Sequence, residues 1–207
     1  MIKKSKTILG VLLLLCISLM AGAGISGAEM ARYDVDPDHS SIEFSVAHMV
    51  VSKTKGRFTD YKGFVEMDPE GLKIKAIEAV INTASVTTMH EKRDGHIKNE
   101  DFFNVEKYPT MTYKMKYSRK EGDNIIAIGD FTMLGVTREV TLTGKFNGVV
   151  KDPYGNTRAG FTAEGKLNRK DFGMNWSKLL DSGGMVVGDD ITLKLEIESI
   201  KAKPVGL

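Results

Sequence analysis

Apolar and polar residues alternate along much of this chain, and this pattern limits the fold more than any other feature. Between residues 41 and 48, Ile42, Phe44 and Val46 occupy one side of an extended segment, while serine, glutamate and alanine occupy the other. The alternation recurs in three later stretches, at 111–117, 139–146 and 191–198. A two-residue period is typical of strands that bury one face and leave the other in water. The chain is therefore predicted to be all-β.

Turn-forming sequences, such as Asp68–Gly71 and Asp152–Asn156, separate the extended segments. The strands are predicted at 41–48, 56–67, 73–83, 110–118, 124–133, 137–149, 158–168 and 190–201. Short connections favour antiparallel neighbours. An open sheet of this kind would expose two edges and one apolar face, whereas closure removes the edges. We expect an eight-stranded antiparallel barrel with a short helical lid between its third and fourth strands.

The inward-facing positions of this barrel mix bulky and small side chains. The bulky ones are Phe44, Val46, Met111, Tyr113, Met115, Phe131, Phe146, Phe161 and Leu167. The small ones are Ala127, Gly129, Gly144, Ala163 and Gly165. Small inward residues leave space for a ligand, but they can equally mark bends at barrel corners. The sequence leaves open whether the interior is hollow or filled.

The lid is predicted from the one helical stretch, 87–111. Thr88 and Glu91 have the spacing of a capping box, Gly95 allows a break, Asn99 can cap a second turn, and Pro109 forbids helix beyond it. The charged and imidazole groups here favour water, while two phenylalanines behind them need apolar cover. We therefore expect this segment at the mouth of the barrel.

A second irregular segment runs from 168 to 189. Its Trp176, Leu179 and Leu180 have the spacing of one face of a short helix, and several glycines follow. A structureless stretch of this length in a compact domain is usually functional or flexible. A second flap over the mouth and an ordinary surface loop with one tucked tryptophan both remain open.

The first 28 residues have the composition of a cleavable signal peptide. Three lysines precede an apolar run at 8–20, which is about 13 residues long and too short to span ~30 Å of hydrocarbon. Cleavage is expected after Ala28, with Ala23 as the second choice and a retained anchor as the alternative. The remainder, 29–207, is expected to be one domain in the periplasm or outside the cell. Loss of three lysines changes the formal charge from +2 to −1, which argues against nucleic acid as a partner.

Catalytic and metal-binding patterns are weak. Cys16, the one cysteine, lies in the leader, and no two of the four histidines have the spacing that places both on one face of a helix for zinc. Asp38, His39 and Ser40 are neighbours on a strand start, where their side chains point in different directions. No phosphate-cradling loop or dinucleotide fingerprint is present. We therefore expect no cofactor, no metal and no enzyme activity.

Short motifs in a fixed order resemble one known family. They are DPDHS from Asp36, GRF from Gly56, NTASVTT from Asn82, RDGH from Arg93, DFF from Asp101, YPTM from Tyr108, GDFTMLGVTRE from Gly129 and NRKDFG from Asn168. Each motif alone is weak, but their order and spacing extend from Tyr33 to Lys201. The chain resembles the YceI-like family of secreted polyisoprenoid-binding proteins. Tyr33 stands where the family often has tryptophan.

The resemblance implies a lipocalin-like barrel whose tunnel holds a long isoprenoid, such as an isoprenoid quinone or a polyprenyl phosphate, or another lipid chain. The tunnel residues implied are Phe44, Val46, Phe58, Phe102, Phe103, Met111, Tyr113, Phe131, Met133, Phe146, Phe161, Leu167, Phe172 and Trp176. The residues assigned to the polar head group are His48, Arg93, Asp94, His96, Arg169 and Asp171. A secreted enzyme acting on a lipid head group and a filled barrel that docks proteins are the alternatives. A transient membrane contact and a homodimer are left open.

Overall fold

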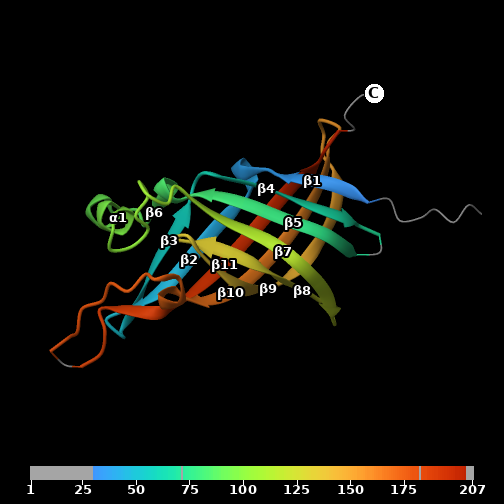
Figure 1. Ribbon diagram of the computed structural model, residues 1–207. Coiled ribbons are helices and arrows are strands. Elements are labelled where there is room, and N and C mark those ends of the chain that lie inside the picture. Colours follow the sequence, from blue (N-terminus) through green and yellow to red (C-terminus); the bar gives the residue numbers. More distant parts are fainter. Residues whose placement is uncertain (1–29, 71, 182, 204–207) are drawn as a thin grey trace, which may run out of the picture.

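A closed antiparallel barrel forms the body of the protein (Figure 1). The computed structural model describes residues 30–70, 72–181 and 183–203, so the predicted leader lies outside the described residues. In order round the ring, the strands are β1 (Ala31–Val35), β4 (Tyr61–Asp68), β5 (Lys73–Asn82), β7 (Thr110–Glu121), β8 (Asn124–Met133), β9 (Val136–Lys151), β10 (Thr157–Asn168) and β11 (Val187–Lys201). The ring closes because β1 pairs with β4 on one side and with β11 on the other. The prediction of an eight-stranded barrel is confirmed.

Three of the long strands are interrupted. The chain passes from β1 through the 3-10 helix η1 (Pro37–His39) into β2 (Ser41–His48). It returns as β3 (Ser52–Phe58) and β4, and β5 continues through η2 (Thr83–Ser85) into β6 (Val86–Thr87). β11 pairs with β1 near its carboxyl end and with β2 along its first two thirds. The predicted strand 56–67 is thus β3 and β4 with a break between them, and β1 was not predicted.

The lid helix is α1 (Glu91–Lys98), which lies at one end of the barrel (Figure 1). The predicted capping box is wrong, because His90 is the N-cap and its Nδ1 accepts a hydrogen bond from the Arg93 amide at 3.3 Å. Thr88 is buried and bonds to other groups of the lid. The helix continues through Gly95, and Asn99 ends it, so the second helical turn expected there is replaced by non-helical turns.

The segment after β10 also differs from the prediction. It begins with η3 (Arg169–Phe172), which stops at Gly173 in the left-handed conformation, with φ of 85°. The helical spacing of Trp176, Leu179 and Leu180 does not produce a helix; Leu179 pairs with Met185 in an isolated β-bridge. The physical reason is that the Arg169 guanidinium binds the carbonyls of Met174 and Trp176 and holds this stretch extended.

Two hydrophobic clusters stabilise the barrel. The larger one contains Phe58, Tyr113 and Phe131, and the aromatic residues of the lid segment pack into it. The smaller one contains Tyr33 and Met67 and lies at the far end, where β1 pairs with the last residues of β11. In the described part of the chain, no helix has the length and hydropathy needed to cross a bilayer.

Candidate functional site

Two adjoining cavities occupy the barrel interior. The inner cavity has a volume of about 180 Å³ and the mouth cavity about 220 Å³. Phe58, Met111, Phe131 and Leu193 line both cavities and so stand between them. Since one water needs only ~10–15 Å³, each cavity holds space for a much larger group. The barrel is therefore not filled by its own side chains.

Apolar side chains and small residues form the wall of the inner cavity. Gly63, Ala79, Gly144 and Ala163 provide space on neighbouring strands. Lys62 and Lys145 also reach its edge, but they alternate onto the exposed outer face. The inner cavity is thus suited to a hydrocarbon chain.

Tyr113 carries a polar group into the inner cavity. Its ring lies over Gly129, where an added Cβ would stand 2.7 Å from Tyr113 Cζ, and its hydroxyl donates to the Ala127 carbonyl at 3.2 Å. Burial, and secondarily the charge of Glu139, raises the pKa of Tyr113 to about 12. The hydroxyl is therefore neutral and already satisfied.

Aromatic residues from three segments meet in the mouth cavity. Phe44 lies on β2, where its ring occupies the space that a Cβ on Gly56 would take. Phe102 comes from the turn after α1, and Trp176 comes from the segment after η3. The His96 ring packs edge-on against Phe102 and Trp176, with centroid distances of 5.1 and 5.0 Å. This contact joins the lid helix to the segment that faces it.

Polar groups also face the mouth cavity. Its polar lining residues are His48, Thr54, Thr88, Arg93, His96 and Arg169. Arg93 donates from Nε to Thr88 Oγ1 at 2.7 Å and from Nη2 to the Thr88 carbonyl at 3.1 Å. Its Nη1 has no hydrogen-bond partner among the described residues. Arg93 is exposed, so a charged donor remains available at the mouth.

His96 and Asp101 form a second polar pair at the mouth, with Nε2 and Oδ2 3.0 Å apart. The other ring nitrogen, Nδ1, has no hydrogen-bond partner in the described part of the chain. The imidazole of His48, on β2, likewise contacts the cavity without a side-chain hydrogen bond among these residues. Both rings can therefore bond to a polar ligand atom.

Asp94 anchors α1 to the barrel instead of lining the cavity. Its carboxylate accepts hydrogen bonds from the Thr87 hydroxyl and the Thr88 amide, both at 2.7 Å, and from the Thr88 hydroxyl. Burial raises the pKa of Asp94, but these hydrogen bonds outweigh burial and hold the pKa below its usual range. The ionised carboxylate thus positions Thr88, which in turn positions Arg93.

Arg169 organises the segment opposite α1. Its side chain is 1% exposed and donates to the carbonyls of Met174, Trp176, Val187 and Gly188 and to the carboxylate of Asp189. Burial lowers the pKa of this guanidinium and Asp189 opposes that effect. Every nitrogen of the guanidinium is engaged, so Arg169 shapes the cavity wall.

The structure brings together most of the residues that the sequence nominated. Of the tunnel set, Phe146 and Phe172 do not line either cavity: Phe146 packs on Phe161, and buried Phe172 packs behind Phe131. Of the head-group set, Asp94 and the exposed Asp171 do not line them either.

Some lining residues were missed by the sequence reasoning. Thr54 carried a signal, because it alternates with Gly56 and Phe58 on the inner face of β3. Ile97, Met174 and Val186 carried none, since the lid helix α1 places Ile97 at the mouth and irregular segments place the other two there.

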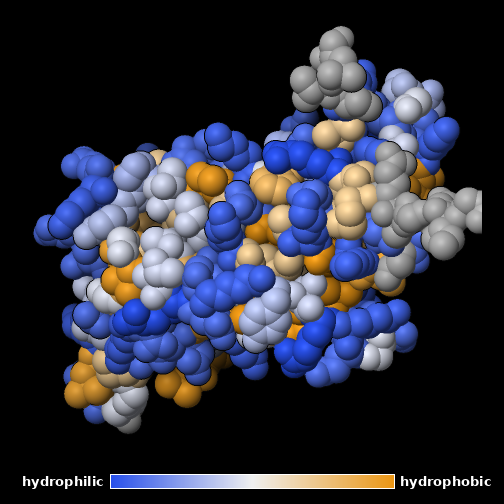
Figure 2. Space-filling model, turned by 45° about the vertical axis from the view of Figure 1, so that its right-hand side comes forward, coloured by the Kyte–Doolittle hydropathy of each residue, from blue (hydrophilic) through white to orange (hydrophobic). Residues whose placement is uncertain are grey.

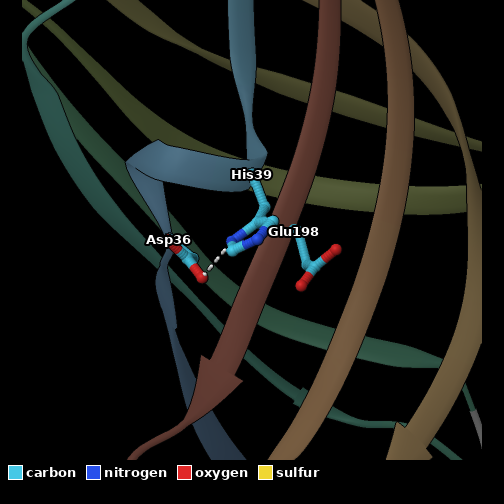
Figure 3. Close-up of side chains that lie close together, drawn as sticks. All are labelled: Asp36, His39 and Glu198. Carbon is cyan, nitrogen blue, oxygen red and sulfur yellow. Dashed lines mark hydrogen bonds and ion pairs between the residues drawn. The ribbon is translucent and has the colours of Figure 1, made fainter. Parts of the chain in front are cut away.

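A separate polar cluster lies outside the cavities, where Asp36, His39 and Glu198 approach one another (Figure 3). His39 Nδ1 is 2.9 Å from Asp36 Oδ2. Arg158 already supplies the cation: its Nη1 donates to both Asp36 and Glu198, and its Nε donates to Asp152. The Arg158 bonds raise the pKa of the guanidinium, and these carboxylates hold the strand break at η1. The cluster is structural, and a metal ion would have to displace the guanidinium.

The closed barrel, its apolar interior and the polar groups at one mouth define a small lipocalin-like β-barrel protein with an enclosed binding space. The pattern of the YceI-like domain matches residues 33–199. The chain belongs to the YceI-like family.

Relatives and solved structures agree. Protein YceI of Escherichia coli O17:K52:H18 (strain UMN026 / ExPEC) is 36% identical over 186 residues, which cover 90% of this chain and 94% of that protein. A Campylobacter jejuni YCEI protein is 32% identical in its crystal structure, with a TM-score of 0.66 over 76% of this chain and 90% of that one. A polyisoprenoid binding domain from Saccharophagus degradans, 14% identical, has a TM-score of 0.60 over 84% of this chain and 100% of that one, and shares the fold.

Proposed function

We propose that this protein binds a long isoprenoid, such as an isoprenoid quinone or a polyprenyl phosphate, or a similar lipid chain, and carries it without catalysis. The observation that carries the proposal is the pair of adjoining, mainly apolar cavities, of which the mouth cavity carries the arginine and imidazole groups. The name of the Saccharophagus degradans domain, which shares the fold, supports the same class of ligand. The predicted signal peptide supports a periplasmic or secreted carrier.

The affinity would come mainly from burial of the chain. Removing apolar surface from water contributes ~25 cal/mol per Å², so each ~100 Å² of buried lipid contributes ~2.5 kcal/mol. A space that is already formed also avoids part of the ordering cost of binding. The lipid tail would therefore occupy the inner cavity. The middle of the lipid would lie between the four residues shared by both cavities, Phe58, Met111, Phe131 and Leu193.

The mouth would select the head group and its direction. The free Nη1 donor of Arg93 suits a phosphate oxygen, and the unpaired nitrogens of His48 and His96 suit a quinone carbonyl. Arg169 would contribute indirectly, because it holds in place the segment of the mouth cavity wall that lies opposite α1.

Extraction of the protein, purified under native conditions, into organic solvent followed by mass spectrometry tests the ligand class. We expect about one long-chain lipid per protein. Recovery of no stoichiometric lipid would contradict the proposal.

A substitution in the inner cavity tests where the tail lies. In delipidated protein, Ala163→Phe fills the inner cavity and should weaken binding of solanesol at least about tenfold, while binding of the shorter farnesol changes less than about twofold. Fluorescence of Trp176, the one tryptophan, reports binding at the mouth. Glu164→Phe is the control, since it adds the same ring on the exposed face of the same strand. Equal affinity of both variants for solanesol would exclude the inner cavity as the tail site.

A further inference from the structure

The mouth end of the molecule carries an exposed apolar projection built from two hairpins. One is the β2–β3 turn, in which Val50 is 76% exposed and Val51 87% exposed. The other is formed by residues 178–181 and 183–186, in which Leu179 is 69% exposed. Orange side chains gather at the lower left of Figure 2, at the end where these segments extend beyond the barrel in Figure 1. We call Met49, Val50, Val51 and Leu179 the apolar tip.

The two hairpins form one unit. The Met49 amide donates to the Val186 carbonyl at 2.9 Å, and the Val186 amide donates to the Lys178 carbonyl at 2.9 Å. Gly184 lies against Val50, since an added Cβ would stand 3.2 Å from Val50 Cγ2. Arg169 fixes the base of the second hairpin. Hydrogen bonds therefore connect the apolar tip to the barrel.

The turn residues are unusual for an exposed hairpin. Met49 and Val50 have φ of 52° and 65°, in the left-handed region that favours glycine and asparagine. A β-branched side chain is disfavoured there. Asparagine or glycine would form such a turn at a lower conformational cost than an exposed valine. The two exposed valines therefore do not stabilise the fold. This placement indicates a surface that works in an apolar environment.

Lysines surround the apolar tip. Lys53 and Lys55 lie on the outer face of β3, and Lys178 lies at the start of the second hairpin. All three are exposed and form no ion pair within residues 30–70, 72–181 and 183–203. Asp181 is the described acidic residue within the second hairpin, and the exposed Asp190 lies on β11 beside β2. The three lysines outnumber these two carboxylates, so the surroundings of the tip carry a net positive charge. Apolar side chains rimmed by lysines match the interface of an anionic membrane.

We propose that the apolar tip is a docking site for an anionic lipid bilayer. The valines and Leu179 enter the interfacial region while Lys53, Lys55 and Lys178 contact the head groups. A second copy of the chain fits less well, because a two-fold contact would place each lysine group against its own copy. The tip continues into the mouth cavity through His48 and Val186, so docking places that cavity next to the membrane.

Vesicle flotation of the purified protein tests the docking site independently of the cargo. We expect binding to phosphatidylethanolamine–phosphatidylglycerol vesicles and weaker binding to phosphatidylcholine vesicles. The double variant Val50→Asn/Val51→Asn should bind at least about tenfold more weakly. Asparagine tolerates the left-handed turn, so this variant should fold. The triple variant Lys53→Gln/Lys55→Gln/Lys178→Gln should lose the preference for anionic vesicles.

The control is Val149→Asn/Val150→Asn, an exposed valine pair at the other end of the barrel. Val150 pairs with Arg158, and Arg158 pairs with Ile200 near the end of β11, whereas the tip adjoins Val187 at its start. The 13 residue steps between Val187 and Ile200 span roughly 43 Å along the strand. The control should bind vesicles like the parent. Equal binding by tip variant and control, or none by the parent, would overturn the proposal.

Two further readouts separate this proposal from its rivals. If light scattering shows the parent as a dimer and the tip variant as a monomer, the tip binds a second copy of the chain. That result would overturn membrane docking. Isoprenoid binding, followed by Trp176 fluorescence, should be unchanged in the tip variant. A tip variant that keeps its cargo but loses the vesicles therefore supports docking, whether or not the cargo is an isoprenoid.

Discussion

The two ends of the barrel each depend on one arginine, and the two arginines work differently. At the far end, Arg158 lies among the carboxylates of Asp36, Asp152 and Glu198, with 18% of its side chain exposed. At the mouth, Arg169 is almost fully buried and binds four backbone carbonyls and one carboxylate.

The difference follows from what each end has to hold. The far end joins regular strands across one short break, and side-chain carboxylates from the N-cap of η1, from β11 and from the β9–β10 turn are enough for that. The mouth must shape an irregular segment whose carbonyls have no strand partner, and a buried guanidinium can satisfy several of them at once. The far end is thus built for closure, and the mouth is built to keep a defined opening.

Replacement of Arg169 should give the largest effect on stability. Arg169→Met leaves buried carbonyls and Asp189 without their donor, so we expect a loss of about 3 kcal/mol or more in the free energy of unfolding. Trp176 should also become more exposed, because its carbonyl is one of the groups released. Urea denaturation and tryptophan emission measure the two effects.

Lys170→Met is the matched control for Arg169. Lys170 is the neighbouring residue and binds the same Asp189, but its side chain is 41% exposed. Its loss should cost less than about 1 kcal/mol. Similar losses in the two variants would show that Asp189, and not the set of carbonyls, carries the function of Arg169.

The roles of these two arginines show how far the sequence could be read. Alternation in β2, β7 and β11 is a local property, so it predicted the barrel and most inward-facing residues. The breaks and caps were predicted less well: Thr88 has the spacing of an N-cap, but its hydroxyl bonds to the Asp94 and Arg93 side chains instead, six and five residues further along the chain.

The segment after β10 failed for the same reason. The spacing of Trp176, Leu179 and Leu180 fits a helix, yet the Arg169 side chain binds the carbonyls of Met174 and Trp176. Leu179 and Leu180 pair with residues that follow them, Leu179 in a bridge to Met185 and Leu180 through its amide to the Gly184 carbonyl. The apolar spacing alone does not show that a side chain five to seven residues earlier in the chain binds these carbonyls. The contact between His96 and Trp176 likewise depends on two segments that meet only in the folded barrel.

Replacement of Arg158 should have a smaller, pH-dependent effect. Burial raises the pKa of Asp36, but hydrogen bonds from Arg158 and His39 outweigh it; Asn156 and Arg158 lower the pKa of Asp152. A carboxylate with a lowered folded pKa stabilises the protein above its unfolded pKa of about 4 and loses that contribution as the pH falls through the folded value. Arg158→Met should therefore lower the melting temperature at pH 7, by less than Arg169→Met does.

Melting temperatures of parent and Arg158→Met should converge as the pH falls below about 4. The variant of an exposed arginine, Arg119→Met, is the control and should follow the parent at every pH, since its pair with Glu121 is on the surface. A constant gap between parent and Arg158→Met from pH 7 to pH 3 would show that the guanidinium contributes packing and not charge.

Arg93 should show the smallest effect, and only with a charged ligand. Arg93→Ala removes the free donor at the mouth and should weaken binding of farnesyl phosphate about tenfold, equal to ~1.4 kcal/mol, while farnesol binding changes less than about twofold. Lys92→Ala on the same helix is exposed and lines neither cavity, so it should leave both ligands unaffected. Titrations followed by Trp176 fluorescence measure the affinities of the parent and both variants for the two ligands.

The ratio between the two ligands decides what Arg93 does. Arg93 also bonds to Thr88, so its loss could loosen α1 and weaken every ligand equally. Equal losses for farnesyl phosphate and farnesol would therefore make Arg93 a lid residue like Asp94. A selective loss for the phosphate would show that the mouth reads the head group. Because the inner cavity contacts only the tail, Ala163→Phe and Arg93→Ala should then act independently, and their effects on a long polyprenyl phosphate should add.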